Sequence, residues 1–112
     1  MEITIRTQEQ VKIIKLRGAL KLGESLDRLS ETLNDQLGAG ELRLVLDLEE
    51  VPMIDSSGIG LLVRALTSTK QRGGTVKLLK PSKFVLQTLK LVALVKLFEI
   101  FDDLPQAVAS FG

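Results

Sequence analysis

The sequence predicts an α/β domain with a mixed, mostly parallel sheet of about five strands and about four helices. Segments with strand-like alternation take turns with segments whose apolar residues recur every three or four positions. The resulting order is β-β-α-β-α-β-α-β-α, and strands separated by helices require right-handed parallel crossovers within one sheet. The 112 residues, 45% of them hydrophobic, suit a single domain that spans 1–112.

The chain is expected to open with a β-hairpin. Ile3 and Ile5 alternate with polar neighbours, and a run rich in β-branched residues follows at 11–17. The apolar phase of this second run changes after Ile13, which indicates either a bulge or a strand buried on both faces. The first strand can only pair antiparallel with the second.

The first helix is expected over residues 26–37, where leucines recur at helical spacing. Ser25 is the expected N-cap, and Gly38 and Gly40 are the expected stop signals. Residues 42–48 carry leucine at every second position, which favours an interior strand covered on both sides.

The second helix is expected from Ser56 to Arg72, with one apolar stripe facing the sheet: Ile59, Leu62, Val63 and Leu66. A short strand at 76–79 follows, and Pro81-Ser82 then starts a helix whose expected inner face is Val85, Leu86, Leu89 and Val92. A last strand is expected at 97–101. Asp103 and Pro105 open a short terminal helix with apolar residues Leu104, Val108 and Phe111.

The composition excludes several classes of function. Lys and Arg (15) balance Asp and Glu (14), so neither nucleic acid nor a membrane is an expected partner. Cysteine and histidine are both absent, which argues against catalytic triads, metal sites and disulfides. No signal peptide or membrane-length apolar run is evident, so we expect a cytoplasmic protein. Because cysteine and histidine are absent, we also expect no enzyme activity, no cofactor and no metal.

The segment IDSSGIG at residues 54–60 places a carboxylate and two hydroxyls where an apolar strand meets an apolar helix. Asp or Ser at this boundary can simply cap the helix. A nucleotide-binding turn is a second interpretation, although the third glycine of the dinucleotide fingerprint and a Gly-Lys-Ser/Thr sequence are missing. A nucleophilic serine is a third, but no histidine exists to activate it.

Regulated modification is the fourth interpretation. A phosphate on a serine at a helix N-terminus gains the free N–H groups and the positive end of the helix dipole, so the protein should stay folded. The phosphate also adds about 1.5 to 2 negative charges beside Asp55. Such a modification would change binding without changing the fold.

Residues 46–63, LDLEEVPMIDSSGIGLLV, resemble the signature of the STAS domain family, and specifically of bacterial anti-sigma-factor antagonists. The likeness extends to VKIIKLRGAL at 11–20, to Arg72-Gly73-Gly74, and to LVKLFEIFD at 94–102 with the following Ala107. Because spacing, flanking strand and element order agree together, the resemblance covers nearly the whole chain.

The resemblance implies a function. In that family the unmodified antagonist binds an anti-sigma factor, a serine kinase of the GHKL type, and so releases the sigma factor. The kinase phosphorylates the first hydroxyl after the motif aspartate, which is Ser56 here, and a serine phosphatase reverses the reaction. By the same analogy Asp55 orients the site and contacts the partner, while Ser57 is expected to act as a capping hydroxyl.

Partner contacts are expected around this segment and on the loop that follows the second strand. The family often has an acidic residue there, whereas this chain has Lys21, which could alter partner choice or attract a phosphate on Ser56. Leu61 and Ala65 fall off the apolar stripe and are expected at the interface. The expected partner-binding residues are therefore Lys21, Asp55, Ser57, Gly58, Ile59, Leu61 and Ala65.

Other classes of function stay open. STAS-like domains also serve as scaffolds of stress-signalling assemblies or as subunits of lipid transporters, without a phospho-switch. A nucleotide sensor or an enzyme is a further alternative. The oligomeric state is left open between a monomer and a weak dimer.

Overall fold

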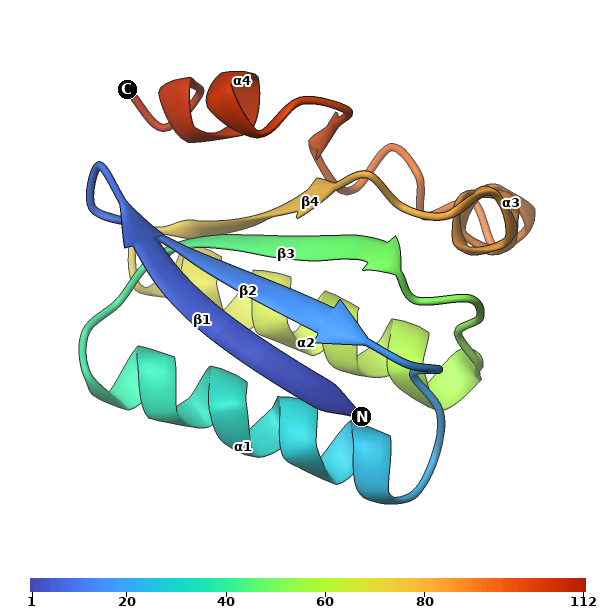
Figure 1. Cartoon of the computed structure of the whole chain (residues 1–112). Coiled ribbons are helices and arrows are strands. Elements are labelled where there is room, and N and C mark those ends of the chain that lie inside the picture. Colours follow the sequence, from blue (N-terminus) through green and yellow to red (C-terminus); the bar gives the residue numbers. More distant parts are fainter.

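The structure, a computed structural model, describes residues 1–112 and contains one five-stranded sheet with four helices (Figure 1). Along the sheet the strands are β1 (Glu2–Gln8), β2 (Val11–Arg17), β3 (Arg43–Glu50), β4 (Thr75–Leu79) and β5 (Ile100–Phe101). The helices are α1 (Glu24–Gly38), α2 (Ser56–Gln71), α3 (Lys83–Leu91) and α4 (Leu104–Ala109). The predicted fold class and element order are confirmed.

The N-terminal hairpin is regular throughout its length. β1 pairs antiparallel with β2 from Glu2–Arg17 to Gln8–Val11 without a bulge. Glu9 and Gln10 form the turn with φ of 52° and 68°, the left-handed conformation of both central residues that a two-residue hairpin favours. The pairs β2–β3, β3–β4 and β4–β5 are all parallel, as crossover helices require.

Helices cover the two faces of the sheet unequally (Figure 1). The inner faces of α1, α2 and α3 form the larger apolar cluster with one face, and α4 packs on the other face in a smaller cluster. β2 contributes Ile14 and Leu16 to the larger cluster and Val11 and Ile13 to the smaller one. Burial on both faces therefore explains its change of phase, and its pairing with β3 also shifts register after Lys15.

The start of the first helix differs from the prediction. α1 begins at Glu24, and its N-cap is Gly23, which offers no side-chain oxygen to the free N–H groups. The Ser25 hydroxyl lies one residue inside the helix and bonds instead to the backbone of Lys21. The expected Ser25 cap is therefore wrong, because the Ser25 hydroxyl is hydrogen-bonded to the preceding loop and not to the first turn of the helix.

The last strand is shorter than expected. Only Ile100 and Phe101 pair with β4, and the segment between α3 and β5 forms turns. Phe98 reaches the core from one of these turns, whereas Leu97 is 45% exposed. Val92, expected on the inner face of α3, is also exposed because the helix ends at Leu91. No helix in the structure is long and apolar enough to cross a membrane.

Candidate functional site

The loops that follow β2 and β3 meet at the carboxyl-terminal end of the sheet, where the parallel strands β2, β3 and β4 all end. Leu20 and Ile54 form an isolated parallel bridge between these loops. The Leu20 N–H donates to the Met53 carbonyl at 3.0 Å, and the Asp55 N–H donates to the Leu20 carbonyl at 3.2 Å. The chain that leads into α2 is thus held against the β2–α1 loop.

Asp55 joins the two loops through its side chain. Its Oδ1 accepts a hydrogen bond from the Gly58 N–H at 2.8 Å and caps α2, as the capping interpretation predicts. Its Oδ2 accepts from the Leu22 N–H at 2.9 Å, so one carboxylate serves a helix and a loop. These backbone donors, Leu22 first and Gly58 second, hold the pKa of Asp55 below its usual value. The carboxylate is therefore ionised at neutral pH.

Gly58 allows this close approach. A Cβ atom at this position would lie 2.7 Å from Ile54 Cγ1 and 2.9 Å from the Leu20 carbonyl oxygen. Both are shorter than real Cβ contacts, so only glycine fits between the helix and the bridge beneath it. Gly58 is buried and supports the site from below; it is not itself a contact surface.

Ser56 is the first residue of α2, and its side chain is exposed to solvent. Its position at the N-terminus places it beside backbone N–H groups that have no partner within the helix. Ser57 is half-buried and its hydroxyl makes no hydrogen bond to the protein, so the expected Ser57 cap is wrong: Asp55 does the capping. Ser56 is thus the more accessible of the two hydroxyls.

The β2–α1 loop contributes two exposed side chains beside Asp55. Lys21 is exposed and forms no ion pair, and Leu22 is 72% exposed although it is a leucine. Leu22 is not among the residues predicted from the sequence to lie at this site. A signal existed, because this leucine precedes a glycine and belongs to neither the strand alternation nor the helical period.

The apolar residues expected at the interface lie elsewhere. Leu61 and Ala65 are each 6% exposed and belong to the larger core cluster, and Ile59 is 8% exposed in the same cluster. The expected docking patch is therefore wrong. α2 packs against both the sheet and α1, so its buried arc is wider than the single stripe that the periodicity predicted.

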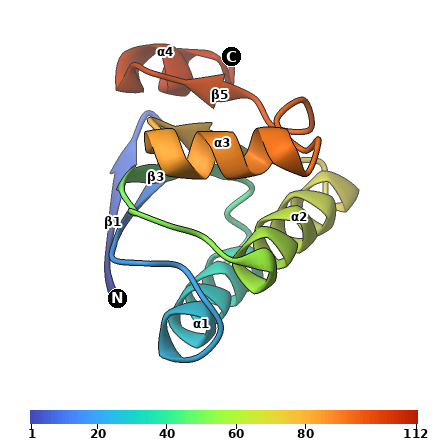
Figure 2. The ribbon, with the colours of Figure 1, turned by 90° about the vertical axis from the view of Figure 1, so that its right-hand side faces the viewer.

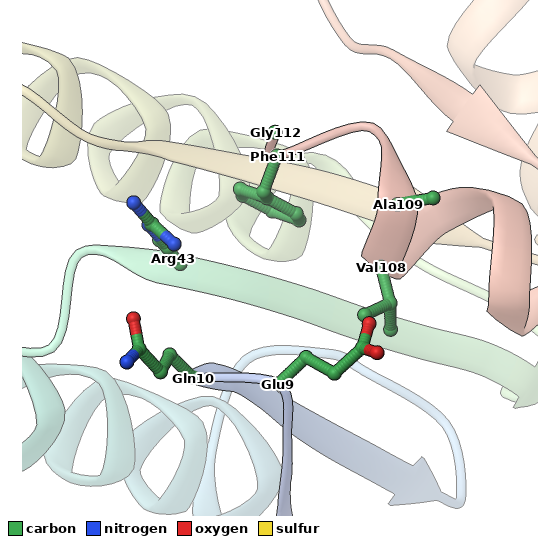
Figure 3. Close-up of a pocket in the computed structure, with 7 residues that line it drawn as sticks. All are labelled: Glu9, Gln10, Arg43, Val108, Ala109, Phe111 and Gly112. Atoms are coloured by element: carbon green, nitrogen blue, oxygen red, sulfur yellow. The ribbon is translucent and has the colours of Figure 1, made fainter.

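A pocket of about 380 Å³ lies at the opposite end of the parallel strands, between the β1–β2 turn, the start of β3 and α4 (Figure 3). Its charged lining residues, Glu9 and Arg43, are exposed and of opposite sign. Neither Ser56 nor Asp55 lines this pocket. The groups around Ser56 instead lie on the molecular surface, an arrangement that suits contact with another protein.

Known proteins share both sequence and fold with this chain. A "putative anti-sigma factor antagonist" from Thermotoga maritima is 32% identical over 72 residues, which span 64% of each protein, slightly less than two thirds of the relative's length. The crystal structure of a protein of that description from Thermotoga maritima superposes with a TM-score of 0.90 at 26% identity, covering 96% of this chain and 92% of the other.

More distant solved structures show the same fold. The anti-sigma factor antagonist SpoIIAA in its unphosphorylated form has a TM-score of 0.81 at 18% identity, covering 98% of this chain and 96% of the other. SpoIIAA of Bacillus in its phosphorylated form has a TM-score of 0.76 at 17% identity, covering 99% and 100%. The profile of the STAS domain matches residues 2–107, and this chain therefore belongs to the STAS domain family.

Proposed function

We propose that this chain is a cytoplasmic anti-sigma-factor antagonist whose unmodified form binds an anti-sigma-factor serine kinase of the GHKL type and thereby releases the sigma factor. One observation carries the proposal: Ser56 is exposed at the first position of α2, next to an ionised aspartate that is already bound to the neighbouring loop. The kinase would transfer the γ-phosphoryl group of ATP to the Ser56 hydroxyl, and a serine phosphatase would remove it. The chain would be their substrate and not itself an enzyme.

The geometry supports a switch that leaves the fold intact. A phosphate on Ser56 would meet the free N–H groups of the first turn, which favour an anion. The Asp55 carboxylate would remain committed to Gly58 and Leu22, so the connection between the loops would not have to break. The change would be confined to about two added negative charges on the surface beside Asp55.

The proposed docking surface consists of Lys21, Leu22, Asp55, Ser56 and Ser57. Leu22 supplies exposed apolar area that a partner can bury, and Lys21 supplies a cation that forms no ion pair with a carboxylate of this chain. Burying a phosphorylated serine beside an ionised aspartate would be unfavourable unless the partner supplied matching cations. Phosphorylation would therefore weaken the complex.

The decisive experiment compares three variants for binding to the candidate kinase by calorimetry. Ser56→Asp is expected to weaken binding roughly tenfold to a hundredfold, which corresponds to about 1.4 to 2.8 kcal/mol. Ser56→Ala should bind and no longer respond to ATP. Ser68→Asp is the matched control, since it introduces the same charge on an exposed part of α2 beyond the first turn.

Mass spectrometry after incubation with ATP and the kinase should locate one added phosphate on Ser56. Thermal unfolding of Ser56→Asp should match the parent within about 0.5 kcal/mol, as expected for a surface substitution. Equal affinity of Ser56→Asp and the parent for the kinase would contradict the switch. A stable complex with another protein that forms equally with and without the kinase and ATP would favour the scaffold function instead.

A further inference from the structure

β1 is a free edge strand along its whole length. It pairs with β2 alone and forms the outer rim of the molecule (Figure 2). Edge strands are usually protected by charged side chains, by proline, by a bulge or by being very short. β1 has seven residues, EITIRTQ, with no proline and no bulge in its pairing. The other edge strand, β5, has only two residues.

The hairpin determines which backbone groups of β1 are free. The two-residue turn makes Gln8–Val11 a hydrogen-bonded pair, and such pairs alternate with non-bonded pairs along an antiparallel ladder. Even-numbered residues of β1 therefore direct their N–H and C=O groups toward β2. The corresponding groups of Ile3, Ile5 and Thr7 point outward, away from the sheet.

The side chains of β1 match a second copy of the same strand. In an antiparallel pair centred on Thr4, Ile3 would face Ile5 of the second copy, and Glu2 would face Arg6. Arg6 forms no ion pair within the chain, and Glu2 has only a 3.4 Å contact to Arg17. Ile5 is 41% exposed, so the pairing would also bury apolar area.

Backbone and side chains require the same register. Centring the pair on Thr4 places outward-directed Ile3 opposite outward-directed Ile5, so both backbone hydrogen bonds can form. Shifting the centre to Ile3 or Ile5 leaves no carboxylate opposite Arg6. A parallel arrangement in the same register would instead place Glu2 beside Glu2 and Arg6 beside Arg6, which is unfavourable.

We propose that two copies of this chain associate through β1, antiparallel about Thr4, to form one continuous sheet across the dimer. A second copy fits this edge because the strand is complementary to itself in charge, apolar contact and backbone polarity. The proposed dimer contact lies along β1 and not at the loops beside Ser56. The dimer proposal therefore does not depend on the proposed function.

Sedimentation velocity over a concentration series up to the millimolar range tests the association. The parent chain is expected to shift from monomer to dimer as its concentration rises. Arg6→Glu would place two carboxylates opposite one another at each end of the pair, and it should raise the dissociation constant about tenfold or more. Lys90→Glu is the control, because it makes the same charge change on the exposed face of α3.

A charge exchange tests the register. Glu2→Arg alone should also weaken the homodimer, whereas an equimolar mixture of Glu2→Arg and Arg6→Glu chains should form heterodimers, detected by native mass spectrometry with one chain isotopically labelled. Every ion pair is restored in that mixture and in no other combination of the two variants. Absence of the heterodimer, while the parent chain dimerises, would overturn the register.

Ile5→Pro tests the backbone pairing separately. The Ile5 N–H points outward, so proline removes no hydrogen bond to β2 and should leave the fold intact by circular dichroism. It should abolish the dimer. A parent chain that stays monomeric throughout the series would overturn the proposal, as would a dimer that persists in both Ile5→Pro and Arg6→Glu. The proposal would likewise be overturned if the parent chain stayed monomeric and its β1 paired instead with an extended segment of the kinase.

Discussion

Asp55 has a structural role that precedes any contact with a partner. Its two carboxylate oxygens accept hydrogen bonds from the backbone of α2 and of the β2–α1 loop. Folding therefore favours the ionised form, which is the physical reason for its lowered pKa. A carboxylate at this position orients Ser56 and Leu22 relative to one another.

Asp55→Asn should reduce stability in a pH-dependent way. Because the pKa of Asp55 is lower in the folded state, its charge contributes stability above the ordinary aspartate pKa of about 3.9. That contribution is lost as the pH falls through the folded-state value. Urea unfolding of both proteins should show a stability difference at pH 7 that narrows steadily below pH 4. A difference that widened on acidification would contradict the assignment.

Gly58 and Gly60 provide a matched pair on the same helix. Gly58→Ala forces a methyl group against Ile54 and the Leu20 carbonyl, and it should destabilise the protein by about 1–3 kcal/mol. Gly60→Ala meets only the end of the Arg64 side chain, at 3.6 Å, and should stabilise the helix by up to about 1 kcal/mol. Chemical denaturation measures both values. Equal effects of the two substitutions would contradict the close packing under Gly58.

At this scale the sequence located the polar residues better than the apolar ones. Asp55 and Ser56 were recognisable because capping and modification chemistry depend on residue type and on a helix start. Leu22 and Leu61 were not, because a leucine carries no mark of whether it faces solvent or a neighbouring helix. Leu61, predicted at the interface, is 6% exposed, whereas Leu22, for which no prediction was made, is 72% exposed beside Asp55.

Among the elements, α4 depends on a contact with the buried side chain of Lys77, which local sequence patterns do not reveal. Lys77 of β4 is 4% exposed, and its Nζ lies 2.8 Å from Glu99 Oε2 and 2.7 Å from Ser110 Oγ. The ring centroid of Phe111 lies 4.3 Å from the same nitrogen, within the range of a cation–π interaction. One ammonium group thus joins β4, the approach to β5 and the end of α4.

Removing the Glu99 side chain should destabilise the protein more than removing the charge of Lys77. Lys77→Met keeps a long unbranched side chain and should change stability little, because replacing a buried ion pair by an apolar side chain is often nearly neutral. Glu99→Ala leaves the buried ammonium without its carboxylate and should cost about 1–3 kcal/mol. Denaturation of the single and double variants checks this, since Glu99→Ala should be nearly neutral in the Lys77→Met background.

For the whole molecule, the two proposed interactions use different parts of one sheet. Ser56 lies at the carboxyl-terminal end of the parallel strands, whereas the self-complementary strand β1 is the edge strand of the sheet. We expect the two to be independent: Arg6→Glu should leave the affinity for the kinase unchanged, and Ser56→Asp should leave the dimer unchanged. Analytical ultracentrifugation and calorimetry on each single variant measure both. Coupling between them would show that the kinase also contacts β1.

Sequence alone determined the order of the elements, the antiparallel start of the sheet and the position of an accessible-hydroxyl motif at a helix start. These depend on local periodicity and on residue chemistry, which a linear pattern records. Only the tertiary structure decided that Leu61 and Ala65 pack against α1, that Lys77 is buried beneath α4, and that β1 has a free edge. Burial at these positions depends on which elements lie next to one another in space, and that is set by packing among residues far apart in the chain.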